Sequence, residues 1–177
     1  MNLQPAVEAD FPEIVALANL AYRGNGDVAS WNVEAGILEG ERLNDSLLRE
    51  NLAAKPDGVL LVWRDAPETQ LLGTAWLNPE HDGVWYLGLL TVHPDIQNRQ
   101  LGRTLLTAAE DYARNRGARR IRITVLHVRE PLIAWYERRS YRRTGHTEPF
   151  PYDDQRFGRP LVQGLHFVEL ERDLTGD

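Results

Sequence analysis

The segment Gln97–Gly102, with the sequence QNRQLG, joins an apolar stretch typical of a strand to a stretch with helical spacing. The start of a helix presents free backbone N–H groups and a partial positive charge, and phosphates bind there readily. Gly102 would let a ligand approach the backbone closely. Four side chains add hydrogen-bond donors, namely Gln97, Asn98, Arg99 and Arg103. The pattern predicts an anion-binding loop, while a solvated loop without a ligand fits the same residues.

Other chemistries lack the residues they need. The chain has no cysteine, which excludes thiol nucleophiles, disulfides and thiolate metal ligands. It contains no GxSxG elbow and neither of the usual nucleotide-binding motifs, GxGxxG and Walker A. The five histidines show no HExxH or paired-ligand spacing, so we expect no metal site.

Composition narrows the expected environment. A net charge of -6 and a pI of about 5.4 argue against nonspecific nucleic-acid binding, which needs a basic face. No apolar run approaches the roughly 20 residues of a membrane span. The first ten residues lack the basic-then-apolar pattern of a signal peptide. We therefore expect a cytoplasmic protein that binds neither nucleic acid nor a membrane.

The length of the chain and the lack of a domain linker predict one domain over residues 1–177. Helices are predicted after an N-cap at Asp10, over Asp45–Ala54, from Leu101 to Gly117, and over the segment beginning REPLIAWYE. Strands are predicted around Leu3 and over Gly58–Asp65, Leu71–Asn78, Val84–His93, Arg120–Leu126, Tyr141–Thr147 and Leu165–Glu171. The helix between the fourth and fifth of these strands implies a right-handed crossover and a parallel pair. The predicted fold class is α/β, or α+β, with a mixed sheet and helices on both faces.

Two motifs resemble those of the GNAT (GCN5-related) N-acetyltransferase family. The segment VHPDIQNRQLGRTLL resembles its acyl-coenzyme-A loop, Q/R-x-x-G-x-G/A, with Gln97 and Gly102 matching and Gln100 in the place of the first glycine. The segment PLIAWYERRSYRRTG resembles a later helix, with Tyr136, Glu137 and Tyr141 in register. Two positions differ from that helix pattern: Ser140 replaces a glycine, and Arg129 stands where many members have asparagine.

The resemblance implies a GNAT acyl-CoA N-acyltransferase fold, with a central sheet of about seven strands, and acetyl-CoA as cofactor. In the family two parallel strands splay apart and the pantetheine arm lies between them. Here these would be Val84–His93 and Arg120–Leu126, with Gly88 marking a bulge that opens the sheet. The implied cofactor-binding residues are Leu90, Thr91, Val92, Gln97, Asn98, Arg99, Gln100, Leu101, Gly102, Arg103, Arg129, Leu132 and Tyr136.

The implied reaction is acetyl transfer to the primary amine of a small-molecule or amino-acid-like acceptor. Tyr136 is the candidate general acid for the leaving thiolate, although an aromatic on this helix is also compatible with a core residue. Glu34 is the candidate base. The implied acceptor-binding residues are Tyr22, Arg23, Trp31, Glu34 and Arg42. These acceptor residues are equally compatible with a solvated surface loop.

Two rival functions fit the same residues. One is a non-catalytic acyl-CoA sensor, which the departures at Gln100 and Ser140 leave open. The other is a protein acetyltransferase that acts on an N-terminus or a lysine. The long loop in the C-terminal region and the last strand could also serve a homodimer interface.

Overall fold

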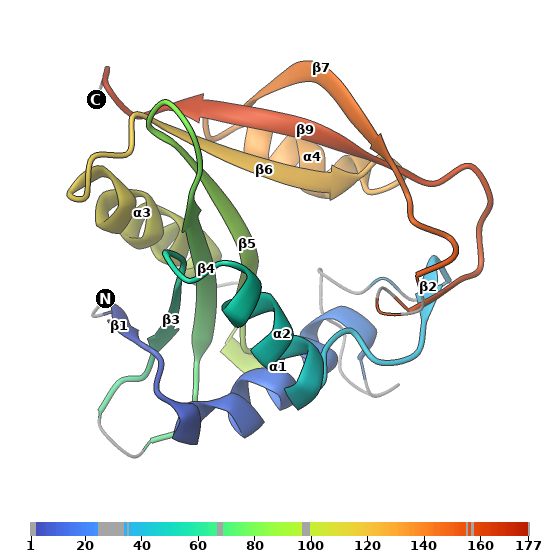
Figure 1. The fold of residues 1–177 in the computed structure, drawn as a ribbon, viewed down its shortest axis with the longest axis horizontal. Helices are drawn as coiled ribbons and strands as arrows, with labels where there is room; N and C mark the ends of the chain where they lie inside the picture. The colour runs from blue at the N-terminus through green and yellow to red at the C-terminus, as the bar shows by residue number, and fades with distance from the viewer. Residues whose placement is uncertain are drawn as a thin grey trace.

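The computed structural model describes residues 3–24, 34, 36–66, 69–96, 100–154, 156 and 158–176. Its centre is a seven-stranded sheet with the order β1-β3-β4-β5-β6-β9-β7 (Figure 1). The strands are β1 (Leu3–Pro5), β3 (Val59–Trp63), β4 (Gly73–Pro79), β5 (Val84–Val92), β6 (Arg120–Leu126), β7 (Arg142–Pro149) and β9 (His166–Asp173). Only β5 and β6 pair in parallel; the other neighbours are antiparallel. This arrangement confirms the predicted mixed sheet.

Helices cover both faces of the sheet because residues along each strand alternate between the faces. The helices are α1 (Phe11–Arg23), α2 (Asp45–Ala54), α3 (Leu101–Arg114) and α4 (Glu130–Glu137). On β3, Leu60 and Val62 belong to the core beneath α1 and α2, while Leu61 belongs to the core beneath α3 and α4. None of these helices, within the part of the chain that is described, is long and apolar enough to cross a membrane.

The predicted N-cap position is confirmed, since Asp10 is the N-cap residue of α1, but the expected side-chain capping is absent. Asp10 ends a short 3-10 helix, Glu8–Asp10, and makes no side-chain cap to α1. Its carboxylate instead accepts hydrogen bonds from the Val7 N–H and from Arg64 Nη2, each at 2.9 Å. Glu13, the expected partner in a capping box, also binds Arg64. Arg64, which directly follows β3, therefore binds both carboxylates, so that neither caps the start of α1.

A second, two-stranded sheet was not predicted from the sequence. It pairs β2 (Leu38–Glu39) with β8 (Arg159–Pro160) in antiparallel fashion. Figure 1 shows β2 beside the chain that connects β7 to β9. The pairing joins the segment between α1 and α2 to the long loop near the C-terminus, and these two segments border the candidate site.

The main sheet opens between its two parallel strands. Register pairs join β5 to β6 only from Val84↔Arg120 to Tyr86↔Arg122, although both strands continue for several residues. On the other edge of β5 the pairing with β4 shifts, so that Leu89 and Leu90 lie opposite a single residue. Leu89 has a φ of 48°, the left-handed conformation found in many bulges. The bulge directly follows Gly88, and the strands diverge beside it.

Candidate active site

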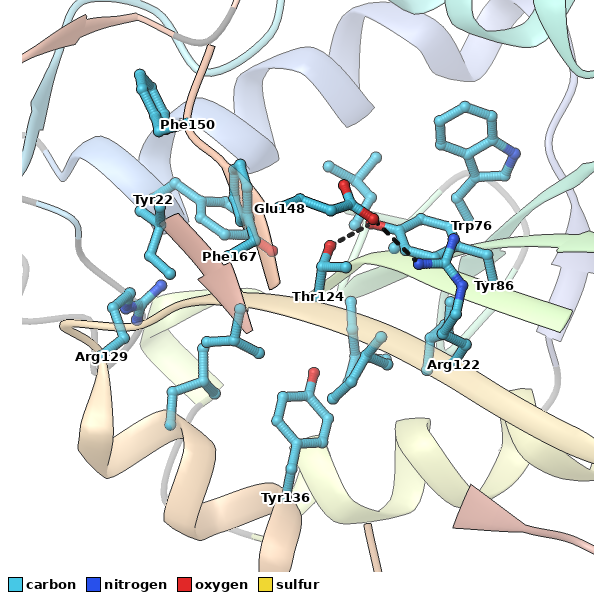
Figure 2. A pocket seen from close by; sticks show the side chains of 18 of the residues that line it. Tyr22, Trp76, Tyr86, Arg122, Thr124, Arg129, Tyr136, Glu148, Phe150 and Phe167 are labelled. Carbon is cyan, nitrogen blue, oxygen red and sulfur yellow. Dashed lines mark hydrogen bonds and ion pairs between the residues drawn. The ribbon is translucent and has the colours of Figure 1, made fainter. Parts of the chain in front are cut away.

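A cavity of about 650 Å³ lies where β5 and β6 diverge. Figure 2 shows Tyr22, Phe150, Phe167 and Arg129 at one end of it. Arg122, Glu148, Tyr86, Thr124 and Trp76 gather at the other end, and Tyr136 points toward the cavity from α4. The cavity therefore reaches from the helix that carries the predicted acid to the opposite face of the sheet.

Tyr136 is fixed by its aromatic neighbours. Its side chain lines the cavity and the residue is only 8% exposed. The rings of Trp135 and Tyr141 meet it edge-on, with centroids 4.9 and 5.3 Å away. Burial raises the pKa of Tyr136 well above its ordinary value, because the phenolate would lose its hydration. The phenol thus keeps its proton near neutral pH, as a proton donor must.

A buried polar network supports Tyr141 in turn. The Tyr141 hydroxyl donates to Glu110 Oε1 at 2.8 Å, and Arg172 Nη1 donates to Glu110 Oε2 at 2.8 Å. Glu110 is 2% exposed, and its burial raises its pKa. The network joins α3, β9 and the end of α4, and it fixes the aromatic ring that lies against Tyr136.

Glu34 reaches the cavity between two arginines. Its backbone N–H donates to the carbonyl oxygen of Tyr22 at 2.8 Å, which ties it to the end of α1. One carboxylate oxygen, Oε2, accepts from Arg23, and Oε1 lies 3.5 Å from Arg129 Nη1. Glu34 and Arg129 are 7% and 8% exposed. These three predicted residues therefore form one ion-pair network, buried at Glu34 and Arg129 and partly exposed at Arg23, rather than parts of a solvated loop.

Tyr22 and Arg42 form the neighbouring wall. Both line the cavity, and the Arg42 guanidinium lies 5.2 Å from the centroid of the Tyr22 ring. Arg42 is held through its backbone, since its N–H donates to Asn19 Oδ1 at 2.6 Å. Trp31, also predicted here, lies outside the described residues.

The predicted anion loop is described only at its helical end, because Gln97, Asn98 and Arg99 lie outside the described residues. Gln100 precedes α3 with a φ of 58° and makes no side-chain cap hydrogen bond. A Cβ at Gly102 would meet only Trp135, at 3.7 Å, which is ordinary contact. The first turn of α3 thus keeps an approachable backbone, with the exposed Arg103 next to it.

The other predicted cofactor residues divide between the cavity and its surroundings. Leu90, Arg129, Leu132 and Tyr136 line the cavity. The side chains of Thr91 and Val92 are buried in β5, and Leu101 begins α3. The predicted backbone contacts with the pantetheine amides are those of Leu90 and Val92, and the buried side chain of Val92 leaves that prediction unaltered.

Sequence reasoning missed the polar end of the cavity. Arg122 donates to both oxygens of Glu80, at 2.9 and 2.7 Å, and this pairing raises its pKa. The same guanidinium lies 3.2 Å from Glu169 and 3.7 Å from Glu148. The alternation of Arg and Thr in RRIRITVL was a usable signal, because it puts Arg122 on the same face as Tyr86, its partner in the parallel register.

One group of side chains near this end could ligate a cation. His146, Glu148 and Glu169 each offer a ligand atom, and these atoms lie within 4.8 Å of one another. Spacing along the chain did not reveal the group, because the pairing of β7 with β9 brings it together. Arg122 already supplies positive charge to both carboxylates.

The family model described as "Acetyltransferase (GNAT) family" matches residues 19–141. The chain therefore belongs to the GNAT acetyltransferase family, which confirms the resemblance found in the two motifs. Among curated proteins, it is 26% identical over 158 residues to the mycothiol acetyltransferases of Rhodococcus jostii (strain RHA1) and Rhodococcus opacus (strain B4). Each match covers 79% of this chain and 51% of the relative, so the chain spans about half the length of these relatives.

Solved structures show the same fold. An N-acetyltransferase from Staphylococcus aureus Mu50 matches with a TM-score of 0.69 and 15% identity, over 98% of both chains. A ribosomal-protein-alanine N-acetyltransferase from Brucella melitensis matches with a TM-score of 0.66 and 21% identity, over 98% of this chain and all (100%) of the other. At these identities the likeness concerns the fold, and it confirms the predicted fold class.

Proposed function

We propose that the protein transfers the acetyl group of acetyl-CoA to the primary amine of a small or amino-acid-like acceptor. The observation that carries the proposal is the position of Tyr136. Its buried phenol faces the cavity that opens between β5 and β6, and residues on the other face of the sheet line the same cavity. A donor bound on one side and an acceptor bound on the other would meet at this opening.

The residues present fit coenzyme A. The first turn of α3 has no side-chain cap, and a Cβ on its glycine would make only an ordinary contact with Trp135, so backbone N–H groups are available to a pyrophosphate. We assign this contact to Gln97–Arg103. The backbone of Leu90–Val92, on the edge of β5 that has separated from β6, would take the pantetheine amides. Bound acetyl-CoA supplies the activated acetyl thioester.

Tyr136 would donate its proton to the departing sulfur. General acid catalysis of this kind contributes about 10²–10⁴-fold in rate. The proposal rests on the position of the phenol and not on its raised pKa, because burial keeps the proton on the phenol but also makes it a weaker acid. Trp135 and Tyr141 would keep the ring in one orientation during the transfer.

The acceptor amine must lose a proton before it attacks. An ordinary primary amine has a pKa near ~10.4, so only about one molecule in a thousand is neutral at about pH 7.4. Glu34 is the proposed proton acceptor, directly or through water, since it is a buried carboxylate on the cavity wall. Its two arginine contacts give it a second proposed role, the alignment of Arg129 at the start of α4.

The test is release of coenzyme A from acetyl-CoA across a panel of amines, amino acids, polyamines and peptides. The panel also includes the acceptor of mycothiol acetyltransferases, because curated relatives carry that name. Wild-type protein is compared with Tyr136→Phe, and Tyr112→Phe on α3 serves as the matched control. Turnover with one acceptor class, reduced in Tyr136→Phe alone, supports the proposal. Acetyl-CoA binding without turnover of any acceptor would favour the sensor function.

A further inference from the structure

The acceptor side of the site does not end at the first cavity. A second cavity of about 720 Å³ adjoins it, and the two share Lys55, Asn78, Glu80, Arg122 and Glu148 as lining residues. The second cavity runs from the end of α2 across β6, β9 and β7. Polar residues cover this part of the sheet face, since the register pairs Arg122 with Glu171 and Thr124 with Glu169. An acceptor longer than a single amine thus has room to continue.

The second cavity is strongly acidic. Its carboxylates are Asp57, Glu80, Glu148, Glu169 and Glu171, against the cations Lys55 and Arg122. Arg122 is occupied chiefly by Glu80, whose two oxygens it binds, and Glu171 lies 3.3 Å from Arg120. The excess negative charge of the cavity therefore lies on Asp57, Glu148 and Glu169.

Glu148 is the carboxylate best placed to meet a ligand. It lines both cavities, and its side chain is 49% exposed. Its carboxylate lies 3.7 Å from the Arg122 guanidinium and 3.9 Å from the His146 imidazole, both long contacts. Figure 2 shows its carboxylate at the Arg122 end of the first cavity, where the Tyr86 ring and Thr124 form the floor.

We propose that the second cavity binds the distal, protonated nitrogen of an elongated acceptor, so that the substrate is a diamine or polyamine. This inference rests on the proposed function, since it concerns the acceptor of the same site. The near amine would react beside Tyr136 in its neutral form, while the far ammonium keeps its charge among the carboxylates. A single positive charge on a flexible chain suits this cavity better than a divalent ion, which the Arg122 guanidinium beside Glu148 and Glu169 would repel more strongly.

The experiment compares α,ω-diaminoalkanes with n-alkylamines of the same carbon number, at low and high salt. After correction for the two equivalent ends of a diamine, kcat/KM for the best diamine should exceed that of its monoamine by about 5- to 10-fold at low salt. High salt should reduce this preference, because it screens the partly exposed Glu148. Glu148→Gln should reduce it as well, whereas Glu50→Gln, an equal charge change on α2 outside both cavities, should preserve it.

Equal kcat/KM for diamines and monoamines would overturn the inference and leave the proposed function standing. Preference for a lysine-rich peptide over every diamine would overturn it in favour of a protein acceptor. Failure to acetylate any amine would contradict the proposed function itself. In that case a linear triamine is titrated calorimetrically into protein saturated with coenzyme A. Binding that Glu148→Gln weakens would uphold the cavity assignment, and absence of binding would overturn it.

Discussion

Arg129 Nη1 lies 3.5 Å from Glu34 Oε1, and this contact connects the two sides of the cavity. Arg129 directly precedes α4, the helix that carries Tyr136, and Glu34 belongs to the segment that follows α1. The second oxygen of Glu34 accepts from Arg23, which also donates to the carbonyl oxygen of Gly40 at 2.7 Å. One carboxylate therefore holds the segment that follows α1 against the start of α4, the helix that bears the candidate acid.

Glu34→Gln should destabilise the protein by about 3 kcal/mol, because it removes a buried carboxylate charge that lies between the Arg23 and Arg129 guanidinium groups. It should also raise KM for the acceptor, since the Arg23 and Arg129 side chains lose the carboxylate that aligns them. Urea unfolding and steady-state kinetics give the two readouts. Glu39→Gln is the matched control, because Glu39 pairs with Arg159 in an exposed position and should change stability by less than about 1 kcal/mol. A fall in kcat with unchanged stability would argue for a proton acceptor and against the alignment role.

Gly102→Asp should abolish measurable acetyl-CoA binding by placing a negative charge against the pyrophosphate. The fold should tolerate the change, since a Cβ at this position meets only Trp135, at 3.7 Å. An acid in the first turn also favours the helix dipole, by about 0.3–1 kcal/mol. Calorimetry should therefore show a loss of acetyl-CoA affinity, while thermal unfolding should show an unchanged or slightly higher Tm. Gly102→Ala, which adds the Cβ without the charge, separates steric from electrostatic effects; binding that survives in Gly102→Asp would refute the anion loop.

The Tyr136 hydroxyl should lose its proton only at a pH above the ordinary tyrosine pKa of about 10. Burial raises the pKa of its phenol, so the protonated form and any activity that needs it persist past about pH 10. The stability that comes from burying the neutral phenol is present below the unfolded pKa, near ~10, and is lost as the pH rises further. The tyrosinate absorbance of wild type minus Tyr136→Phe measures the titration. A Tyr136 signal that appears below pH 10 would contradict the assigned burial.

Gln100→Gly and Ser140→Gly should each stabilise the protein by about 0.5–1 kcal/mol. Both residues have a left-handed backbone conformation, with φ of 58° and 68°. The strain of holding a side chain in this conformation costs more free energy than glycine loses in chain entropy on folding. These are the two positions where the chain departs from the family's glycines. The midpoint of urea unfolding measures the gain in stability. Gln100→Ala and Ser140→Ala, which keep the Cβ, should show no gain. Lower stability in both glycine variants would mean that the side chains contribute more than the strain costs.

Local sequence determined the elements and the candidates for chemistry. The helix of Leu101–Arg114, with Leu105, Leu106 and Ala109 buried on one side, was predictable because apolar residues recur with the helical period. The parallel relation of β5 and β6 followed from the intervening helix. Tyr136 was identifiable because its motif is contiguous in the chain. The N-cap position at Asp10 was predicted correctly, but its side chain does not cap the helix, because Arg64, 54 residues further along the chain, binds that carboxylate.

Only the tertiary structure decided which side chains meet. Glu34 joins Arg129 across 95 positions of sequence, Arg122 joins Glu80 and Glu169, and β2 joins β8, through sheet register and loop packing that no local period encodes. The acidic second cavity arises in the same way, from strands and a helix end that are distant in the chain. Periodicity shows which face of an element is buried, whereas the partner across that face depends on the register and packing of the whole fold.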